Sequence, residues 1–386
     1  MHIGIDARFY GPLAKGLGRY VQKLIEHLEQ LDDANRYTVF MRRDAWDMYQ
    51  PKNPRFTKVL ADVAWYTLRE QVELPKILKA HKLDLMHFPH YNVPLLYRGQ
   101  FVVTVHDLIL SKYPTRRAST LGPVFYWIKH TAYNHVIRSA IRRSKAVLTV
   151  SEYSKQAIIE EFHIRPEKIT VTYEAADPLP SVQPSREQEA AVQSFQPYLL
   201  YVGNAYPHKN LESLLRAFQI IKQRFNQPLN LVFVGKRDYF YKRLEQLATS
   251  LHIEDSVRFA GGVDDEELAT LYRHASLYVF PSFIEGFGLP PLEAMRAGVP
   301  VVSSNRSCLP EVLGDAVEYV DPSDTEAMAT TISRVLANQQ LQQQLRERGF
   351  RQVERFRWDD LATATLAVYT QVGRLRLRHG ILAKPV

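Results

Sequence analysis

Short apolar runs recur along this sequence, and between them apolar residues return every three or four positions. The runs are typical of buried strands, whereas the spaced pattern is typical of one face of a helix. Strands that alternate with helices in this way predict a mainly parallel sheet covered by helices on both faces. In the first half of the chain we expect strands at residues 3–7, 37–41, 56–60, 83–88, 101–105, 146–150 and 169–173.

The same alternation resumes after a polar, proline-rich stretch that begins at residue 178 and has the composition of a linker. The length of 386 residues suits two domains of about 180 residues each. We therefore predict two Rossmann-like domains and a last helix, over residues 1–180, 181–357 and 358–386. Within the second domain we expect strands at residues 197–203, 231–234, 257–260, 277–280 and 316–320.

The strand at residues 277–280 is followed by a glycine-rich loop, a short helix and another strand. Pro290 and Pro291 fit the start of this helix, because a residue in the first turn needs no partner for its N–H group. Gly298 fits its end. This loop-to-helix step predicts an anion site, since loop N–H groups and a helix N-terminus together bind phosphate.

Two carboxylates flank the predicted anion site. Glu285 lies in the loop, and we expect Glu293 in the first turn of the helix. A phosphate on the amides and sugar hydroxyls on the carboxylates would together suit a sugar nucleotide. For either glutamate alone, a solvated surface residue is the favoured interpretation, so the sugar-nucleotide interpretation depends on the whole stretch.

The string Glu-Gly-Phe-Gly-Leu-Pro-Pro-Leu-Glu-Ala from residue 285, with Ala-Gly-Val-Pro-Val-Val from residue 297, resembles the Glu-x7-Glu signature of retaining glycosyltransferase family 4. The resemblance implies the α/β fold called GT-B, in which two Rossmann-like α/β/α domains face each other across a cleft. The first domain would take the acceptor and the second the nucleotide-sugar, and the last helix would cross back to the first. It also implies that Glu285 contacts the donor sugar, that Glu293 contacts the ribose, and that the diphosphate is held by Gly286, Phe287, Gly288 and Leu289.

Lys209 lies just before a predicted helix, where its ammonium group can act as a point charge for a phosphate. The surrounding segment resembles the family's glycine-to-lysine segment, whose lysine contacts the donor diphosphate. Many members also carry an arginine there, either just after the glycine or just before the lysine, and these positions are Asn204 and His208 in this chain. Lys236 or a protonated His208 could replace that cation. The resemblance assigns further donor contacts to Gly203, Asn204, Gly235 and Lys236.

Gly16 and Gly18 lie in a predicted loop before a helix that runs to about Leu31. A Gly-x-Gly pair at a helix start can cradle a phosphate. It is not a full dinucleotide fingerprint, because Val21 stands where the third glycine belongs. In family 4 the matching loop borders the donor phosphates.

His106 directly follows the predicted strand at residues 101–105. A histidine at the carboxyl end of a buried strand points into the crevice where open α/β sheets bind ligands. Since the ordinary pKa of histidine lies near neutrality, His106 can hydrogen-bond a sugar hydroxyl or a developing charge, and it matches the family's His-Asp step. For His87, His90 and Tyr91, contact with a sugar and packing both stay open.

The net charge of +8 suits a nucleic acid, an anionic membrane or an anionic small substrate. The basic residues form no continuous stripe, so we do not expect a nucleic-acid partner. Two basic clusters are compatible with contact to anionic lipid or with a solvated helix face, and both alternatives stay open. The clusters are Arg138, Arg142, Arg143 and Lys145, which follow the aromatic residues 125–127, and Arg374, Arg376 and Arg378.

Cys308 is the one cysteine, which excludes an internal disulfide framework and fits a reducing compartment. No apolar run approaches the roughly 20 residues that span a membrane. The first residues lack the pattern of a secretory leader. We therefore expect a cytoplasmic protein, with peripheral contact at the inner face of the cell membrane as an open alternative.

Taken with the resemblance, these features predict a hexosyltransferase (EC 2.4.1.-) that moves a sugar from a nucleotide diphospho-sugar to a glycan or lipid-linked hydroxyl, with retention of the α configuration. His106, Lys209 and Glu285 would be catalytic, and neither a cofactor nor a metal is expected. Residues 4–8 and 16–20 look like those of bacterial mannosyltransferases, so mannose is the first expectation. A sugar-nucleotide-binding protein without turnover is one alternative, and a nicotinamide-dependent oxidoreductase, which the missing third glycine disfavours, is the other.

Overall fold

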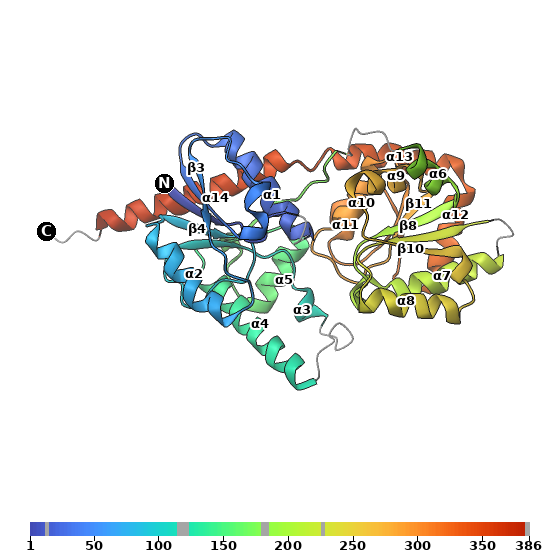
Figure 1. Ribbon diagram of the computed structural model, residues 1–386, viewed down its shortest axis with the longest axis horizontal. Coiled ribbons are helices and arrows are strands. Elements are labelled where there is room, and N and C mark those ends of the chain that lie inside the picture. Colours follow the sequence, from blue (N-terminus) through green and yellow to red (C-terminus); the bar gives the residue numbers. More distant parts are fainter. Residues whose placement is uncertain (12–14, 114–122, 179–184, 225–227, 383–386) are drawn as a thin grey trace. The chain divides into compact units, whose positions relative to one another are not determined.

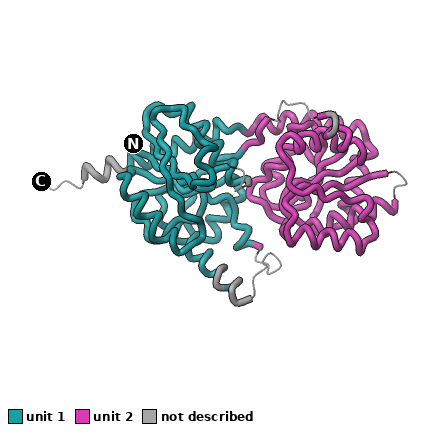
Figure 2. The backbone as a smooth tube through the Cα atoms, viewed as in Figure 1, with its two compact units in different colours: residues 1–112, 121–174, 357–386 teal, residues 113–120, 175–356 magenta. Residues whose placement is uncertain are grey.

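The computed structural model describes residues 1–11, 15–113, 123–178, 185–224 and 228–382. Its contacts divide the chain into two compact units (Figure 2). Unit 1 consists of residues 1–112, 121–174 and 357–386, and unit 2 consists of residues 113–120 and 175–356. Unit 1 is therefore discontinuous in sequence, since unit 2 is inserted ahead of its last segment.

Unit 1 is built on a seven-stranded sheet of order β3-β2-β1-β4-β5-β6-β7, in which every strand pair is parallel (Figure 1). The chain order reverses between β1 and β4, and this reversal is the topological switch point where open α/β sheets bind ligands. The strands are β1 (His2–Asp6), β2 (Arg36–Met41), β3 (Phe56–Leu60), β4 (Leu85–Phe88), β5 (Phe101–Thr104), β6 (Ala146–Thr149) and β7 (Ile169–Val171).

Helices cover both faces of the sheet in unit 1 (Figure 1). Helices α2, α4 and α5 contribute Leu74, Ile137 and Ile158 to one apolar core. On the other face α1 packs along α14, where His27 Nδ1 lies 2.6 Å from Asp359 Oδ1. The helices are α1 (Lys15–Leu31), α2 (Leu68–Ala80), α3 (Ile109–Lys112), α4 (Pro123–Arg143), α5 (Glu152–Phe162) and α14 (Trp358–Leu382), with 3-10 turns η2 (Arg43–Met48) and η4 (Pro166–Lys168).

Unit 2 repeats this architecture with a six-stranded parallel sheet of order β10-β9-β8-β11-β12-β13, whose switch point lies between β8 and β11. Its strands are β8 (Tyr198–Val202), β9 (Asn230–Val234), β10 (Val257–Gly261), β11 (Leu277–Phe280), β12 (Val301–Ser304) and β13 (Glu318–Val320). Its helices are α6 (Arg186–Gln193), α7 (Leu211–Arg224), α8 (Tyr239–Ser250), α9 (Asp265–His274), α10 (Leu289–Arg296), α11 (Leu309–Leu313), α12 (Thr325–Ala337) and α13 (Gln339–Val353), with 3-10 turns η5 (Pro207–Lys209) and η6 (Glu254–Ser256). The predicted pair of parallel α/β domains is confirmed.

Two local predictions were wrong. Gly16 and Gly18 lie inside the first turn of α1 rather than in a loop, because that helix already begins at Lys15. Glu293 is the fifth residue of α10 rather than a first-turn residue, because the helix starts at Leu289, ahead of both prolines.

Candidate functional site

Three glycines bring the carboxyl ends of β8, β9 and β10 close together in unit 2. The Gly203 N–H donates to the Val234 carbonyl (2.9 Å), and the Gly235 N–H donates to the Gly261 carbonyl (2.9 Å). A Cβ added at Gly235 would lie 2.0 Å from the Gly203 carbonyl oxygen, so no other residue fits there without moving backbone. These glycines therefore allow the strand ends beside the switch point to pack closely.

Lys209 and Glu285 form a buried ion pair across this switch point. Lys209 ends η5 after β8, and Glu285 lies in the loop after β11. The ammonium nitrogen is 2.7 Å from Oε1 and 2.8 Å from Oε2 of Glu285, with side-chain exposures of only 14% and 8%. The same nitrogen lies 5.8 Å from the centre of the Phe280 ring. The structure thus joins two of the predicted catalytic residues directly.

Asn210 fixes the loop that carries Lys209. Its backbone is left-handed (φ 59°), and its amide nitrogen donates to the carbonyls of Pro281 (3.2 Å) and Pro322 (2.7 Å). The Phe283 N–H in turn donates to the His208 carbonyl (2.8 Å). The loops after β8, β11 and β13 are therefore tied together, which holds Lys209 against Glu285.

His208 does not supply the missing cation. Its side chain is buried, and this burial, followed by the nearby charge of Lys209, lowers the pKa of His208 to about 4. The ring is therefore neutral at pH 7, which contradicts the protonated role. Lys236 remains the candidate, since it is exposed directly after Gly235. Asn204 contributes its carbonyl to the Tyr201 hydroxyl (2.8 Å), so it shapes the loop through its backbone.

In the loop before α10, the apolar side chain of Phe287 points into the core of unit 2. The Phe287 ring packs edge-on against Phe356 with centroids 5.5 Å apart. The Cys308 sulfur lies 3.3 Å from the carbonyl oxygens of both Glu285 and Phe287, which share its single S–H donor, and burial raises the pKa of this thiol well above its usual range. Gly288 precedes the helix with φ 101°. The Phe287 ring is therefore a buried packing group of unit 2.

Glu293 lies on α10, half-buried, and its Oε2 accepts a hydrogen bond from the Tyr272 hydroxyl at 3.0 Å. Tyr272 is itself a buried residue of α9, so the carboxylate is aimed by a neighbouring helix. The local sequence around Glu293 could not reveal this partner, which lies 21 residues earlier.

In unit 1, both ring nitrogens of His106 face acceptors. Nδ1 lies 3.2 Å from Oε1 of Glu174, and Nε2 lies 3.0 Å from the Pro89 carbonyl oxygen. Only the doubly protonated ring donates to both. Burial lowers the pKa of His106, but the hydrogen bond and charge of Glu174 and the Pro89 carbonyl outweigh it, so the pKa is raised. Glu174 was missed in the sequence, although it too follows a strand.

The other candidates in unit 1 are a histidine, His87, and the two glycines at the start of α1. His87 is fully buried, and its nitrogens lie 2.6 Å from the Tyr369 hydroxyl and 2.9 Å from the Thr104 hydroxyl, so it is a packing residue. A Cβ on Gly18 would lie 1.9 Å from the Gly11 carbonyl oxygen, whereas one on Gly16 would meet nothing within 4 Å. Gly18 is thus required by the fold, whereas no close approach requires a glycine at position 16.

The predicted site residues therefore gather in two places. Within unit 2 the structure joins Lys209 to Glu285 and places them among the glycine-bearing strand ends and the loop before α10. Within unit 1 it places His106 after β5 and Gly18 at the start of α1.

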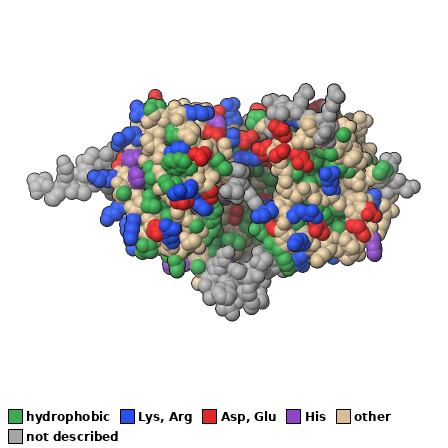
Figure 3. All heavy atoms as spheres, viewed as in Figure 1, with side chains coloured by type: hydrophobic (Ala, Val, Ile, Leu, Met, Phe, Trp, Pro, Cys, Tyr) green, Lys and Arg blue, Asp and Glu red, His purple; other side chains and the backbone are tan. Residues whose placement is uncertain are grey.

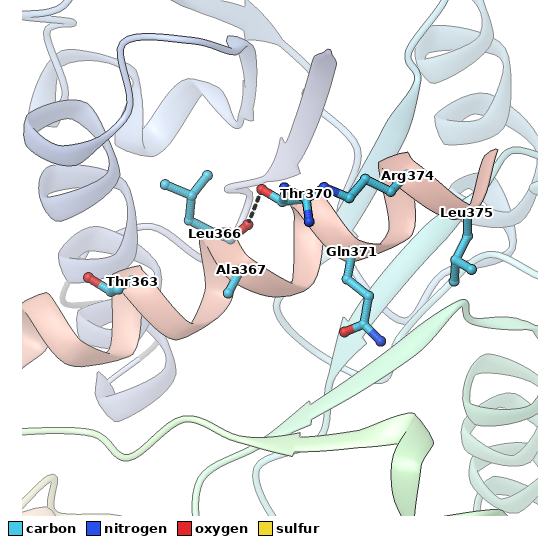
Figure 4. A pocket seen from close by; sticks show the side chains of 7 residues that line it. All are labelled: Thr363, Leu366, Ala367, Thr370, Gln371, Arg374 and Leu375. Atoms are coloured by element: carbon cyan, nitrogen blue, oxygen red, sulfur yellow. Dashed lines mark hydrogen bonds between the residues drawn. The ribbon is translucent and has the colours of Figure 1, made fainter. Parts of the chain in front are cut away.

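Among the described residues, the other surfaces of the two units have few reactive or charged groups gathered in one place. A groove along α14 is lined by Thr363, Leu366, Ala367, Thr370, Gln371, Arg374 and Leu375, of which only Arg374 is charged (Figure 4). Figure 3 shows Lys and Arg side chains interspersed with acidic and apolar ones on each unit. Over the described ranges, no cluster of His, Cys, Asp or Glu could hold a metal ion. Nor does that part of the chain contain a helix long and apolar enough to cross a membrane.

Comparison with known proteins gives a consistent result. The family model "Glycosyl transferases group 1" matches residues 183–352, and "Glycosyltransferase Family 4" matches residues 14–178. O-antigen chain mannosyltransferase B of Escherichia coli is 33% identical over 300 residues, covering 76% of this chain and 75% of that protein. O-antigen chain mannosyltransferase RfbU of Salmonella typhimurium is 30% identical over 283 residues, covering 73% of each. Sucrose-phosphate synthase from Thermosynechococcus elongatus shares the fold, with a TM-score of 0.73 at 22% identity over 96% of this chain and 99% of that one.

Proposed function

The chain belongs to the group 1 glycosyl transferases of glycosyltransferase family 4, and from that premise we propose that it transfers mannose from a nucleotide diphospho-sugar to a hydroxyl of a glycan or lipid-linked glycan. The glycosyltransferase class follows from the family. The sugar, the nucleotide and the acceptor are the finer part of the proposal, as is retention of the α configuration.

The Lys209–Glu285 pair carries this proposal. An ammonium group has three N–H donors, so Lys209 can hold Glu285 and a phosphate oxygen at the same time. The 2.7 and 2.8 Å contacts fix the carboxylate beside that phosphate position, where it can accept hydrogen bonds from the transferred sugar. A cation and a carboxylate side by side at a switch point match a ligand that is anionic at one end and rich in hydroxyls at the other.

In the proposed reaction the bond between the anomeric carbon and the phosphate oxygen breaks, and a bond to the acceptor oxygen forms on the same face. The leaving nucleoside diphosphate takes up the acceptor's proton. Its growing charge is stabilised by Lys209, by Lys236 and by the amides of residues 286–289, and loss of one such donor costs on the order of 3 kcal/mol. Glu293, aimed by Tyr272, holds the ribose.

His106 would contact the transferred sugar near the reacting carbon. The raised pKa of His106 favours its protonated form, which can stabilise negative charge that develops on the sugar phosphate. Because Lys209 and Lys236 provide positive charge for the leaving diphosphate, we propose that the reaction proceeds without a metal ion or cofactor.

Mannose is the first candidate sugar because two relatives at 33% and 30% identity are named as O-antigen chain mannosyltransferases. GDP-mannose is therefore the first donor to test, and a UDP-hexose the second. An acceptor on a lipid carrier would also account for a cytoplasmic enzyme that works at the inner face of the membrane.

We further propose that α4 makes peripheral contact with anionic lipid. Trp127 on this helix is 56% exposed, and Arg138 and Arg142 are exposed as well. Arg143 does not take part, since its guanidinium donates to the carbonyls of Leu95 (3.1 Å) and Tyr97. The side chains of residues 125, 126, 376 and 378 lie outside the described residues. Loss of vesicle binding in Trp127→Ala is the expected result, and unchanged sedimentation with phosphatidylglycerol vesicles would overturn this part.

Thermal unfolding against a ligand panel tests the donor. The panel contains GDP, UDP, ADP, GDP-mannose, UDP-glucose, UDP-N-acetylglucosamine and NAD. A ligand at about 100 times its dissociation constant adds roughly 2.7 kcal/mol to the free energy of unfolding. We expect a shift with GDP and GDP-mannose. A shift with NAD alone would support the oxidoreductase instead, and wild-type turnover by Glu285→Ala would contradict the catalytic assignment.

A further inference from the structure

Backbone strain marks a second site, in unit 1. Six described residues other than glycine have left-handed backbones. Three of them, Lys82, His163 and His252, end α-helices, where this conformation is ordinary. The other three end no α-helix and therefore require another reason. They are Tyr66, Asn210 and Ser307.

Two of these three hold the proposed donor loops. Asn210 ties the loop of Lys209 to its neighbours, and the Ser307 hydroxyl accepts a hydrogen bond from the Glu285 N–H at 3.1 Å. Strain in these two positions thus coincides with the site. Tyr66, with φ 62°, is the third, and it lies in unit 1.

A fully buried carboxylate holds Tyr66 in its strained conformation. The Tyr66 N–H donates to Oε2 of Glu70 at 2.8 Å. Oε1 of Glu70 accepts from the Arg8 guanidinium (2.6 Å) and from the Asn92 amide (2.8 Å). The arrangement at Tyr66 is therefore specified by a network of charged hydrogen bonds and is not a loosely held turn.

Arg8 joins the carboxyl-end loops of three strands. It donates to both oxygens of Asp6 at the end of β1, each at 2.8 Å, and to the Val63 carbonyl after β3 (3.1 Å). Through Glu70 it also reaches Asn92, which follows β4. Because β1 and β4 flank the switch point of this sheet, Arg8 braces the edge where α/β sheets bind ligands.

The braced loops carry a cluster of rings, with Tyr66 as its exposed member. The Tyr66 side chain is 56% exposed, and its ring lies 6.0 Å from that of His90. His90 contacts Tyr91 (3.9 Å) and Phe9 (5.2 Å), and Phe9 stacks on Trp65 (4.6 Å). An exposed aromatic ring on a rigid base offers one flat apolar face to a ligand.

The Tyr66 and His90 rings of this cluster are uncharged, whereas the Arg42 guanidinium lies 4.6 Å from the centre of the Trp65 ring. Burial, followed by the charge of His106, lowers the pKa of His90 to about 3, so its ring is neutral at pH 7. Burial raises the pKa of Tyr66 to about 12, so its hydroxyl stays protonated. A neutral aromatic face beside hydroxyl and imidazole groups suits a pyranose ring, whose C–H groups pack on the aromatic face while its hydroxyls form hydrogen bonds.

The cluster also adjoins the predicted catalytic histidine within the same unit. The carbonyl that accepts from His106 Nε2 at 3.0 Å belongs to Pro89, the residue before His90. A sugar stacked on Tyr66 would therefore lie near His106. We propose that Tyr66 forms a stacking subsite for a neutral pyranose of the acceptor glycan, an inference that rests on the proposed transferase function.

Substitution by glycine separates this role from a structural one. Glycine adopts a left-handed backbone without strain, so Tyr66→Gly should fold with an unchanged or higher Tm while losing the ring. Lys82→Gly is the matched control, because Lys82 is an exposed unit 1 residue with φ 49° at the end of α2. Tyr66→Phe keeps the stacking face and lacks only the hydroxyl.

The binding measurement is an NMR titration of the full chain without donor. The probes are the methyl α-glycosides of mannose, glucose, galactose and N-acetylglucosamine. We expect wild type to bind at least one probe, Tyr66→Gly to raise its dissociation constant at least tenfold, and Tyr66→Phe and Lys82→Gly to stay within threefold. Equal binding by Tyr66→Gly and wild type, or no binding of any probe by wild type, would overturn the subsite.

Three further outcomes separate this inference from the rest. A loss of phosphatidylglycerol vesicle binding by Tyr66→Gly with unchanged sugar binding would make Tyr66 a lipid contact and overturn the proposal. Failure of every nucleotide in the thermal panel would contradict the proposed transferase and leave the sugar titration decisive for Tyr66. Conversely, donor-dependent transfer with an unaltered acceptor KM in Tyr66→Gly would retain the transferase and reject the subsite.

Discussion

Lys209 holds Glu285 with both carboxylate oxygens within 2.8 Å of its ammonium nitrogen, in a site where both side chains are largely removed from water. Removing one partner of such a pair leaves an uncompensated buried charge, at a cost of about 3–5 kcal/mol. Removing both charges together avoids that cost. The pair therefore allows stability and catalysis to be separated.

Neutralising both residues should restore folding without restoring activity. We expect Lys209→Met and Glu285→Gln each to lower the free energy of unfolding, and the double variant to recover most of the loss. All three should reduce donor turnover by about 100-fold or more, because each removes a group that acts on the charged donor. Urea unfolding and a nucleotide-release assay measure the two effects. Recovery of turnover in the double variant would show that the pair serves only the fold.

Glu174 should set the pH dependence of the reaction through His106. The raised pKa of His106 means that its cation persists below that pKa and is lost as the pH rises through it. Asp107 also favours the cation, while the pKa values of His87 and His90, at about 3, leave those rings neutral. Glu174→Gln should move the basic limb of the kcat/KM profile to lower pH. A basic limb at the wild-type position would show that His106 does not act as a cation.

His208 should make the protein less stable in mild acid. Its folded pKa of about 4 lies below the ordinary value of 6.5, so the folded state binds fewer protons than the unfolded state between these values. The associated stability is complete above pH 6.5 and is lost as the pH falls towards 4, by up to roughly 3 kcal/mol. His208→Asn should flatten the fall in unfolding free energy between pH 7 and 4.5. His87 and His90 act in the same direction and leave a remaining slope, whereas an unaltered slope would rule out a neutral buried His208.

The two glycines at the start of α1 should respond oppositely to alanine. Gly16→Ala should raise the free energy of unfolding by up to about 1 kcal/mol, because alanine is the better helix former and its Cβ would meet nothing within 4 Å. Gly18→Ala should lower it by about 1–3 kcal/mol, because its Cβ would lie 1.9 Å from a backbone oxygen. Thermal and urea unfolding of the pair provide the comparison. Equal effects at both positions would exclude close approach as the reason for Gly18.

The positions of buried strands could be predicted well from the sequence, because such strands are continuous apolar runs. The bounds Leu277–Phe280, where all four residues are buried, agree with the structure residue for residue. The start of α1 could not be predicted, because two glycines disfavour a helix locally and the carbonyls of Phe9 and Gly11 that require Gly18 are brought close only by the fold.

Candidate residues were recognisable by their place after a strand, whereas their partners were not. Lys209 and Glu285 were each predicted, but their contact joins positions 76 residues apart. His87 has the same local setting as a ligand-binding histidine, and only its contact with Tyr369, 282 residues later, shows that it packs the core. Pattern reveals which residues lie at a sheet edge, and tertiary contacts decide which of them face a ligand.

The discontinuity of unit 1 affects how the protein is made. Its sheet is translated first, yet α14, which supplies the Tyr369 hydroxyl to buried His87 at 2.6 Å, leaves the ribosome only after all of unit 2. Domains generally fold as units during synthesis, so unit 2 can finish while the earlier sheet still waits for its last helix. Unit 1 is thus the first unit to be synthesised and the last to be completed. A chain that terminated near residue 357 would lack α14, and we expect this loss to destabilise unit 1 more than unit 2.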